Sequence, residues 1–224
     1  NKNVVNNIKR LGFKCAEALP NKEYKINNFF KLSNYPDNHD SAYVFTIGDK
    51  VYLNQNDCQL SNRQCTQIKD RYGTIDVWFM QFSLAGYYAN KTNHKGLLLA
   101  KNYHKDMINK YYNFFKPKMF VPFASFVYFC KEHNFFLNDW IIDMDEVNKD
   151  FSDLPLQCLF YGDSLKYKNY TDRNITNFQK WNKIFRKDKK VLKHEVVPND
   201  DIVAEASKGK SEKSLLTSSI SIIQ

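Results

Sequence analysis

Four apolar segments of the chain end in polar side chains, and these residues have the chemistry that a binding or catalytic site needs. A carboxylate can bridge two cations, whereas amides, hydroxyls and an imidazole can position a substrate by hydrogen bonding. Taken singly, each residue also has a structural explanation; Asp57, for example, is a suitable cap for a following helix. The candidates are Asn56, Asp57, Gln81, Ser125, Glu132, His133 and Asn134.

The spacing of histidines and cysteines excludes several classes of site. The five histidines never stand at H-x-H or H-x-x-x-H spacing, so the chain has no histidine-rich metal motif. His39, His94 and His104 stand alone and are not expected to bind a ligand. The five cysteines form no C-x-x-C pair, which is typical of reduced thiols and predicts a cytoplasmic protein. A nucleophile elbow, a phosphate-cradling glycine loop and an H-E-x-x-H helix are also missing from the sequence.

The hydrophobic pattern predicts strands that alternate with helices, which is typical of a layered α/β (α+β) protein with mixed sheets. Gly48–Asp49 predicts a hairpin between two strands, and Pro117 is expected to end the longest helix. Helices are expected over residues 2–11, 62–72, 95–115, 145–151, 174–185 and 200–216. Strands are expected over residues 14–18, 24–32, 41–47, 50–54, 75–83, 119–126, 158–163 and 191–197. We predict one domain over residues 1–207 and a mobile tail over 208–224.

The composition is that of a chain able to bury a core. Of its 224 residues, 43% are hydrophobic and 16% aromatic, which excludes a disordered chain of low hydrophobicity. No apolar run approaches the roughly 20 residues of a membrane-spanning helix, so no membrane partner is expected.

The net charge of +9 is concentrated in one segment. Residues 164–194 carry ten Lys or Arg and two Asp, a balance of +8, with aromatic residues at helical spacing. An amphipathic helix with a solvated lysine face explains this pattern, and a site for phosphate or nucleic acid is the alternative. Because no nucleic-acid-binding motif accompanies the charge, no specific nucleic-acid partner is expected.

In their order along the chain, four segments resemble the metallo-β-lactamase-fold superfamily. They look closest to the branch related to the non-Rieske part of CMP-N-acetylneuraminate hydroxylase. The most specific pieces are NQNDC, residues 54–58, and PFASFVYF, residues 122–129. The resemblance covers roughly residues 40–167, through the segments 40–58, 75–88, 115–139 and 158–167.

The resemblance implies an αββα sandwich with metal ions at the rim between two sheets. Asp57 would correspond to the aspartate that bridges two divalent ions, zinc or iron, in this superfamily. The remaining candidates would bind a small-molecule substrate at the same rim; they are Asn56, Gln81, Ser125, Glu132, His133 and Asn134.

The chain also departs from the family pattern. The main metal motif of the superfamily, H-x-H-x-D-H, does not occur in the sequence, and a lone carboxylate does not hold zinc tightly. One explanation is that the chain is the C-terminal part of such a protein, completed by an N-terminal half or a second chain. The other explanation is that the metal site has decayed. The first is favoured because the sequence does not begin with Met and starts shortly before the matched region.

Three functions are compatible with these observations. The first is a metal-dependent hydrolase of a phosphoester, ester or amide, or the C-terminal part of one, with Asp57 as metal ligand. The second is an oxygenase-like protein that acts on a nucleotide sugar, which would need an iron–sulfur electron donor from elsewhere. The third is a non-catalytic module whose basic segment, 166–193, binds phosphate-rich or glycan partners.

Overall fold

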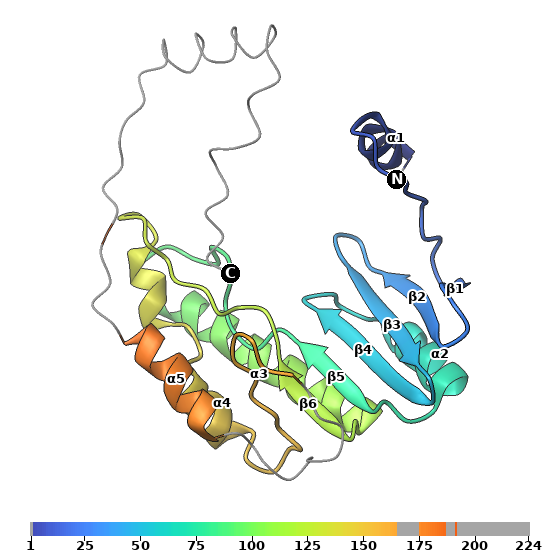
Figure 1. Ribbon diagram of the computed structural model, residues 1–224. Helices are drawn as coiled ribbons and strands as arrows, with labels where there is room; N and C mark the ends of the chain where they lie inside the picture. Colours follow the sequence, from blue (N-terminus) through green and yellow to red (C-terminus); the bar gives the residue numbers. More distant parts are fainter. Residues whose placement is uncertain (1, 165–174, 187–190, 192–224) are drawn as a thin grey trace, which may run out of the picture.

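The structure is a computed structural model that describes residues 2–164, 175–186 and 191 (Figure 1). The helices in this part of the chain are α1 (Lys2–Arg10), α2 (Asn62–Tyr72), α3 (His94–Phe115), the 3₁₀ helix η1 (Phe135–Asp139), α4 (Met144–Asp150) and α5 (Ile175–Phe185). The strands are β1 (Glu23–Lys25), β2 (Phe30–Pro36), β3 (Ser41–Ile47), β4 (Lys50–Asn56), β5 (Val77–Met80) and β6 (Met119–Pro122).

The six strands form one mixed sheet in the order β1-β2-β3-β4-β5-β6. Strands β1 to β4 pair antiparallel, and β5 and β6 continue parallel to β4. This arrangement confirms the mixed α/β class. The second sheet that an αββα sandwich requires is not among the residues that the structure describes.

The parallel strands bring their carboxyl ends to one edge of the sheet. Asn56 pairs with Met80, and Met80 pairs with Pro122, so β4, β5 and β6 end side by side. The register shifts between Asn54 and Asn56, which marks an irregularity at the end of β4. Ligand sites in α/β sheets form outside such carboxyl ends, so this edge positions the candidate site.

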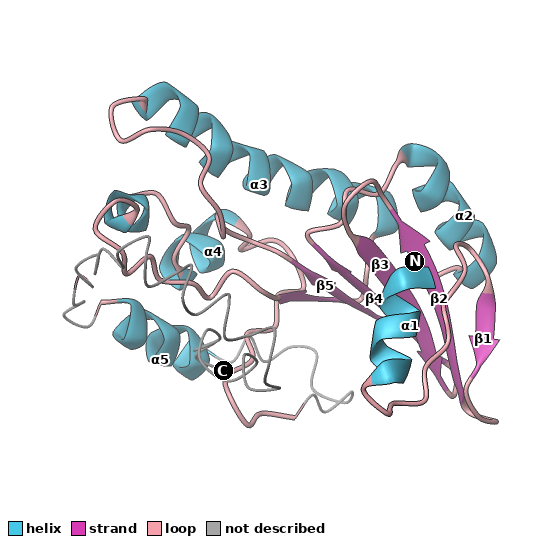
Figure 2. Cartoon of the chain, turned by 90° about the horizontal axis from the view of Figure 1, so that it is seen from above, coloured by secondary structure: helices cyan, strands magenta, loops and turns pink. Residues whose placement is uncertain are grey.

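The main core lies between the sheet and the helices on one of its faces. Figure 2 shows α2 and α3 running along that face. Trp78 of β5 is fully buried there and its ring lies 4.8 Å from that of Phe120. The Tyr111 hydroxyl of α3 donates to the carbonyl of Leu60, which fastens the helix to the segment after β4.

A buried carboxylate fastens the opposite edge of the sheet, where the parallel strands begin. Asp76 is 3% exposed, and its Oδ2 accepts a hydrogen bond from the amide of Val51 at 2.8 Å. Its Oδ1 pairs with Nζ of Lys118 at 2.8 Å. The side chain of Asp76, just before β5, therefore links the start of β4 to the residue that precedes β6.

The predicted helices within the described residues and the hairpin of β3 and β4 are confirmed, with ends shifted by one or two residues. The cap expected at Ser61 or Asn62 is Ser61, which forms a capping box with Gln64 at the start of α2. The amphipathic interpretation of the basic segment is confirmed for α5, which buries Phe178 and Phe185 and stacks Trp181 on Phe126 at 3.9 Å.

Several predicted strands are wrong. Residues 14–18 do not form a strand. The strand expected over 24–32 is divided into β1 and β2 by a turn, in which Oδ1 of Asn27 accepts hydrogen bonds from the backbone amides of Phe29 and Phe30. Residues 158–163 form a loop, whose backbone carbonyls at Cys158 and Leu159 accept hydrogen bonds from side chains of α5. Of the strand expected over 191–197 only Val191 is described, and it is assigned to no strand; the helix over 200–216 and the tail over 208–224 lie outside the described residues.

All five cysteines lie in the described part of the chain and none is in a disulfide. Among the helices of that part, none combines the length and the apolar character needed to cross a membrane.

Candidate functional site

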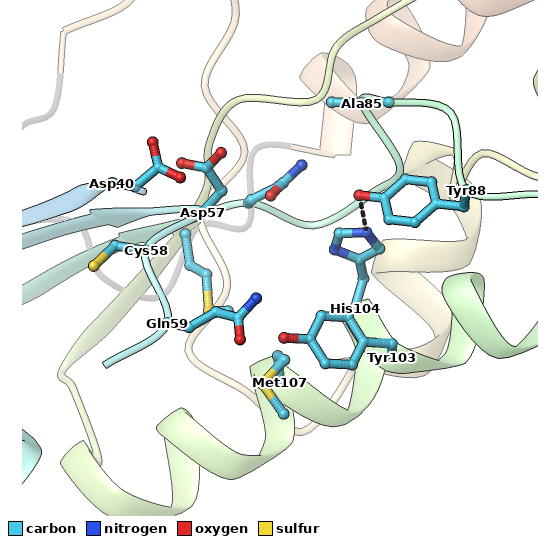
Figure 3. Close-up of a pocket in the computed structure, with 12 residues that line it drawn as sticks. Asp40, Asp57, Cys58, Gln59, Ala85, Tyr88, Tyr103, His104 and Met107 are labelled. Carbon is cyan, nitrogen blue, oxygen red and sulfur yellow. Dashed lines mark hydrogen bonds between the residues drawn. The ribbon is translucent and has the colours of Figure 1, made fainter. Parts of the chain in front are cut away.

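The carboxyl edge of the parallel strands opens into a pocket of about 320 Å³, which we call the Asp57 pocket (Figure 3). Its volume is within the usual range of small-molecule sites. Residues from the turn before β3, from the ends of β4 and β5 and from α3 contribute side chains to it. The polar ones are Asp40, Asp57, Gln59, Gln81, Tyr88, Tyr103 and His104.

A buried amide builds the turn that carries Asp57. Gln55 is fully buried; its Nε2 donates to the carbonyl of Cys58, and its Oε1 accepts from Nε1 of Trp78 at 3.0 Å. Asn56 takes a left-handed conformation with φ of 51°, which asparagine tolerates better than most residues. The amide of Gln81 donates to the Asn56 carbonyl, which attaches the turn to β5. The carboxylate of Asp57 is thus held on a rigid strand end.

Replacing Gln55 with Leu should lower the free energy of unfolding by about 1–3 kcal/mol, since the buried Trp78 indole N–H then lacks its acceptor. Chemical denaturation measures this loss. The same substitution at the exposed Gln59 is the control and should change stability by less than about 0.5 kcal/mol. Equal effects at both positions would contradict the role of Gln55 in holding the turn.

Two carboxylates lie side by side at one rim of the pocket. Figure 3 shows Asp40 next to Asp57, and burial together with the negative charges of Asp57 and Asp37 raises the pKa of Asp40. Nδ2 of Asn56 donates to Oδ1 of Asp57 at 2.7 Å. The carboxylate of Asp37 accepts hydrogen bonds from the backbone amides of Asp40 and Gln59, and these bonds hold the backbone on both sides of the rim in place. The rim therefore concentrates negative charge that a cation would neutralise.

The opposite wall is formed by an imidazole between two tyrosines. Nε2 of His104 lies 3.2 Å from the Tyr88 hydroxyl, and the rings of Tyr88 and Tyr103 meet the imidazole at 5.8 and 5.7 Å. His104 is 5% exposed, and this burial lowers the pKa of His104 to about 4. Burial and the charge of Asp57 raise the pKa of Tyr88. At pH 7 both groups are neutral, so the wall can donate and accept hydrogen bonds.

The structure brings two of the predicted site residues into this pocket, Asp57 and Gln81. Asn56 supports Asp57 through its amide instead of lining the pocket. Ser125 follows β6 in a left-handed conformation with φ of 63° and is 6% exposed. Its Oγ has no hydrogen-bond partner among the described residues, and the side chain does not line the Asp57 pocket.

Two other predicted residues, Glu132 and His133, line a second pocket of about 510 Å³. Asn134 begins η1, where its Oδ1 accepts the amide of Lys131. The segment after β5 separates the two pockets, because Tyr88 lines the first and Tyr87 the second. The candidates expected at one rim are therefore divided between two cavities.

Asp40, Tyr88, Tyr103 and His104 were not predicted as site residues. Asp40 ends a turn cluster and Tyr88 follows a strand, and neither position has a spacing that singles it out. His104 is one histidine on the inner side of a long helix, a position more typical of a core residue. The packing of α3 against the carboxyl edge is what brings Tyr103 and His104 into the same pocket as Asp57.

Within residues 2–164, 175–186 and 191, no group of three or more His, Cys, Asp or Glu side chains is placed to hold a metal ion. No protein-family model, no curated protein and no solved structure matches the chain.

Proposed function

We propose that the chain is a metal-dependent hydrolase of the metallo-β-lactamase-fold type, or the C-terminal part of one. In this proposal Asp57 is a metal ligand and the Asp57 pocket receives a small-molecule substrate. The observation that carries the proposal is the position of Asp57: it lies at the carboxyl end of a parallel strand, in a pocket, beside a second carboxylate. Carboxylates so placed are suitable ligands for divalent cations.

The donor set of the described residues does not complete a tight metal site. A catalytic zinc site typically has three protein ligands, whereas the rim offers the two carboxylates of Asp40 and Asp57. The imidazole of His104 is on the opposite wall and hydrogen bonded to Tyr88. The remaining ligands would therefore have to come from outside the described residues, from another part of the protein or from a partner.

One face of the sheet carries half-exposed aromatic side chains, which supports the idea that the chain is part of a two-sheet sandwich. On the face of the sheet away from α2 and α3, Phe45 stacks on Tyr52 at 5.1 Å and meets Phe30 edge-on. Tyr43 and Ile47 on the same face are 37% and 43% exposed. A second sheet would bury such a face, as in a sandwich of two sheets.

Binding of Mn²⁺, followed by electron paramagnetic resonance, tests the proposal. With two carboxylates alone, we expect a dissociation constant on the order of 1 mM. Asp57→Asn should weaken binding by about tenfold or more, since it removes one charge from the rim. The control is Asp49→Asn, at an aspartate that is 84% exposed on the hairpin.

Turnover provides the second part of the test. Wild-type protein should hydrolyse p-nitrophenyl acetate, p-nitroacetanilide or p-nitrophenyl phosphate faster with Mn²⁺ than with EDTA, and Asp57→Asn should abolish the difference. Metal binding that is equal in the wild type and both variants would remove Asp57 from the site. Turnover that does not respond to metal would contradict the hydrolase.

A further inference from the structure

We propose that the Asp57 pocket binds a small organic cation, with its positive group at Asp40 and Asp57 and a hydrogen-bonding group at Nδ1 of His104. This inference goes beyond the proposed function and needs no metal ion. It rests on two chemically different walls that face each other across one cavity.

The first wall supplies negative charge, and it faces aromatic rings across the cavity. Asp40 and Asp57 lie side by side at the rim of the pocket, so their two carboxylates repel each other. An ammonium group between them relieves this repulsion and gains attraction from both carboxylates. Tyr88 and Tyr103 line the same cavity, and aromatic rings attract cations.

The second wall supplies a free hydrogen-bonding atom. Nε2 of the His104 imidazole is bonded to the Tyr88 hydroxyl, whereas Nδ1 has no hydrogen-bond partner among the described residues. The His104 side chain is only 5% exposed, and it lines the pocket. If Tyr88 donates to Nε2, Nδ1 carries the proton and donates to the ligand; with the other tautomer Nδ1 accepts.

Three compounds with the same ring and hydroxyl test the charge preference: 4-hydroxybenzylamine, 4-hydroxybenzyl alcohol and 4-hydroxybenzoate. They are titrated into ¹⁵N-labelled full-length protein with EDTA, and affinities are read from chemical shifts. We expect the amine to bind about tenfold tighter than the benzoate, with the alcohol between them. In Asp57→Asn this preference should be lost, and in Asp49→Asn it should remain.

The His104 contact is tested by comparing 4-hydroxybenzylamine with benzylamine, which lacks the hydroxyl. The hydroxyl should improve affinity about threefold to tenfold in the wild type and give no gain in His104→Phe. The ¹⁵N shift of Nδ1 in the wild type provides the same readout without a variant, since the amine should move it and the benzoate should not.

A benzoate that binds as tightly as the amine would overturn the inference, as would shifts confined to the second pocket around Glu132 and His133. Absence of binding by all three compounds would also overturn it. Because the titrations contain EDTA, these outcomes are independent of whether Asp57 binds Mn²⁺, and the failure of one proposal is distinguishable from the failure of the other.

Discussion

The free energy of unfolding should fall by roughly 3 kcal/mol as the pH is lowered from 6.5 to 4, because of His104. In the folded protein, burial lowers the pKa of His104 to about 4, whereas the unfolded chain binds this proton near pH 6.5. Between these values the unfolded state binds more protons than the folded state. Stability therefore rises with pH across this window, and the gain is complete about one pH unit above 6.5.

Urea unfolding at pH 4, 5, 6 and 7 measures this dependence in the wild type and in His104→Phe. The variant retains every other titrating group, including Asp40, Asp57 and the two tyrosines, so the difference between the two curves isolates the histidine. His94→Phe, at an exposed histidine, should keep the wild-type slope. Parallel curves for the wild type and His104→Phe would show that His104 is not held neutral by burial.

Asp76→Ala should lower the free energy of unfolding by about 3 kcal/mol, because a buried charged acceptor of two hydrogen bonds is lost. The amide of Val51 then has no acceptor at the start of β4. The ammonium of Lys118 contributes less, since its side chain is half exposed and regains water. Chemical denaturation at pH 7 measures the loss.

Asp49→Ala is the matched control for Asp76→Ala. Asp49 also pairs with a lysine, Lys50, but its side chain is 84% exposed and solvent screens the pair, so its removal should leave the free energy of unfolding nearly unchanged. Asp76→Asn should lie between the two alanine variants, because an amide oxygen can still accept from Val51. A loss below about 1 kcal/mol for Asp76→Ala would contradict its role in joining the parallel strands.

The fold was predictable where local signals decide it. The hairpin of β3 and β4 follows from alternating residues around Gly48–Asp49, and α2 follows from a capping residue at Ser61 or Asn62 and from Gly73 at its end. Prediction failed for 158–163, an apolar run that lies in a loop because side chains of α5 bind its backbone. That outcome depends on contacts between distant segments, which periodicity does not report.

The site was predictable in part for the same reason. Asp57 and Gln81 follow strands, and strand ends meet at one edge, so their common pocket follows from chain order. His104 reaches that pocket only through the packing of α3, and the segment after β5 determines that Glu132 and His133 line another cavity. The spacing of residues in the sequence predicts neither the packing of α3 against this edge nor the division into two pockets.

Paramagnetic broadening by Mn²⁺ tests the claim that Asp57 lies at a cation-binding rim. In ¹⁵N spectra of the full chain, substoichiometric Mn²⁺ should broaden first the amide signals of Asp40, Asp57 and Gln81, and Asp57→Asn should remove this selectivity. Broadening that begins at other carboxylates, or that is the same in wild type and Asp57→Asn, would contradict the claim.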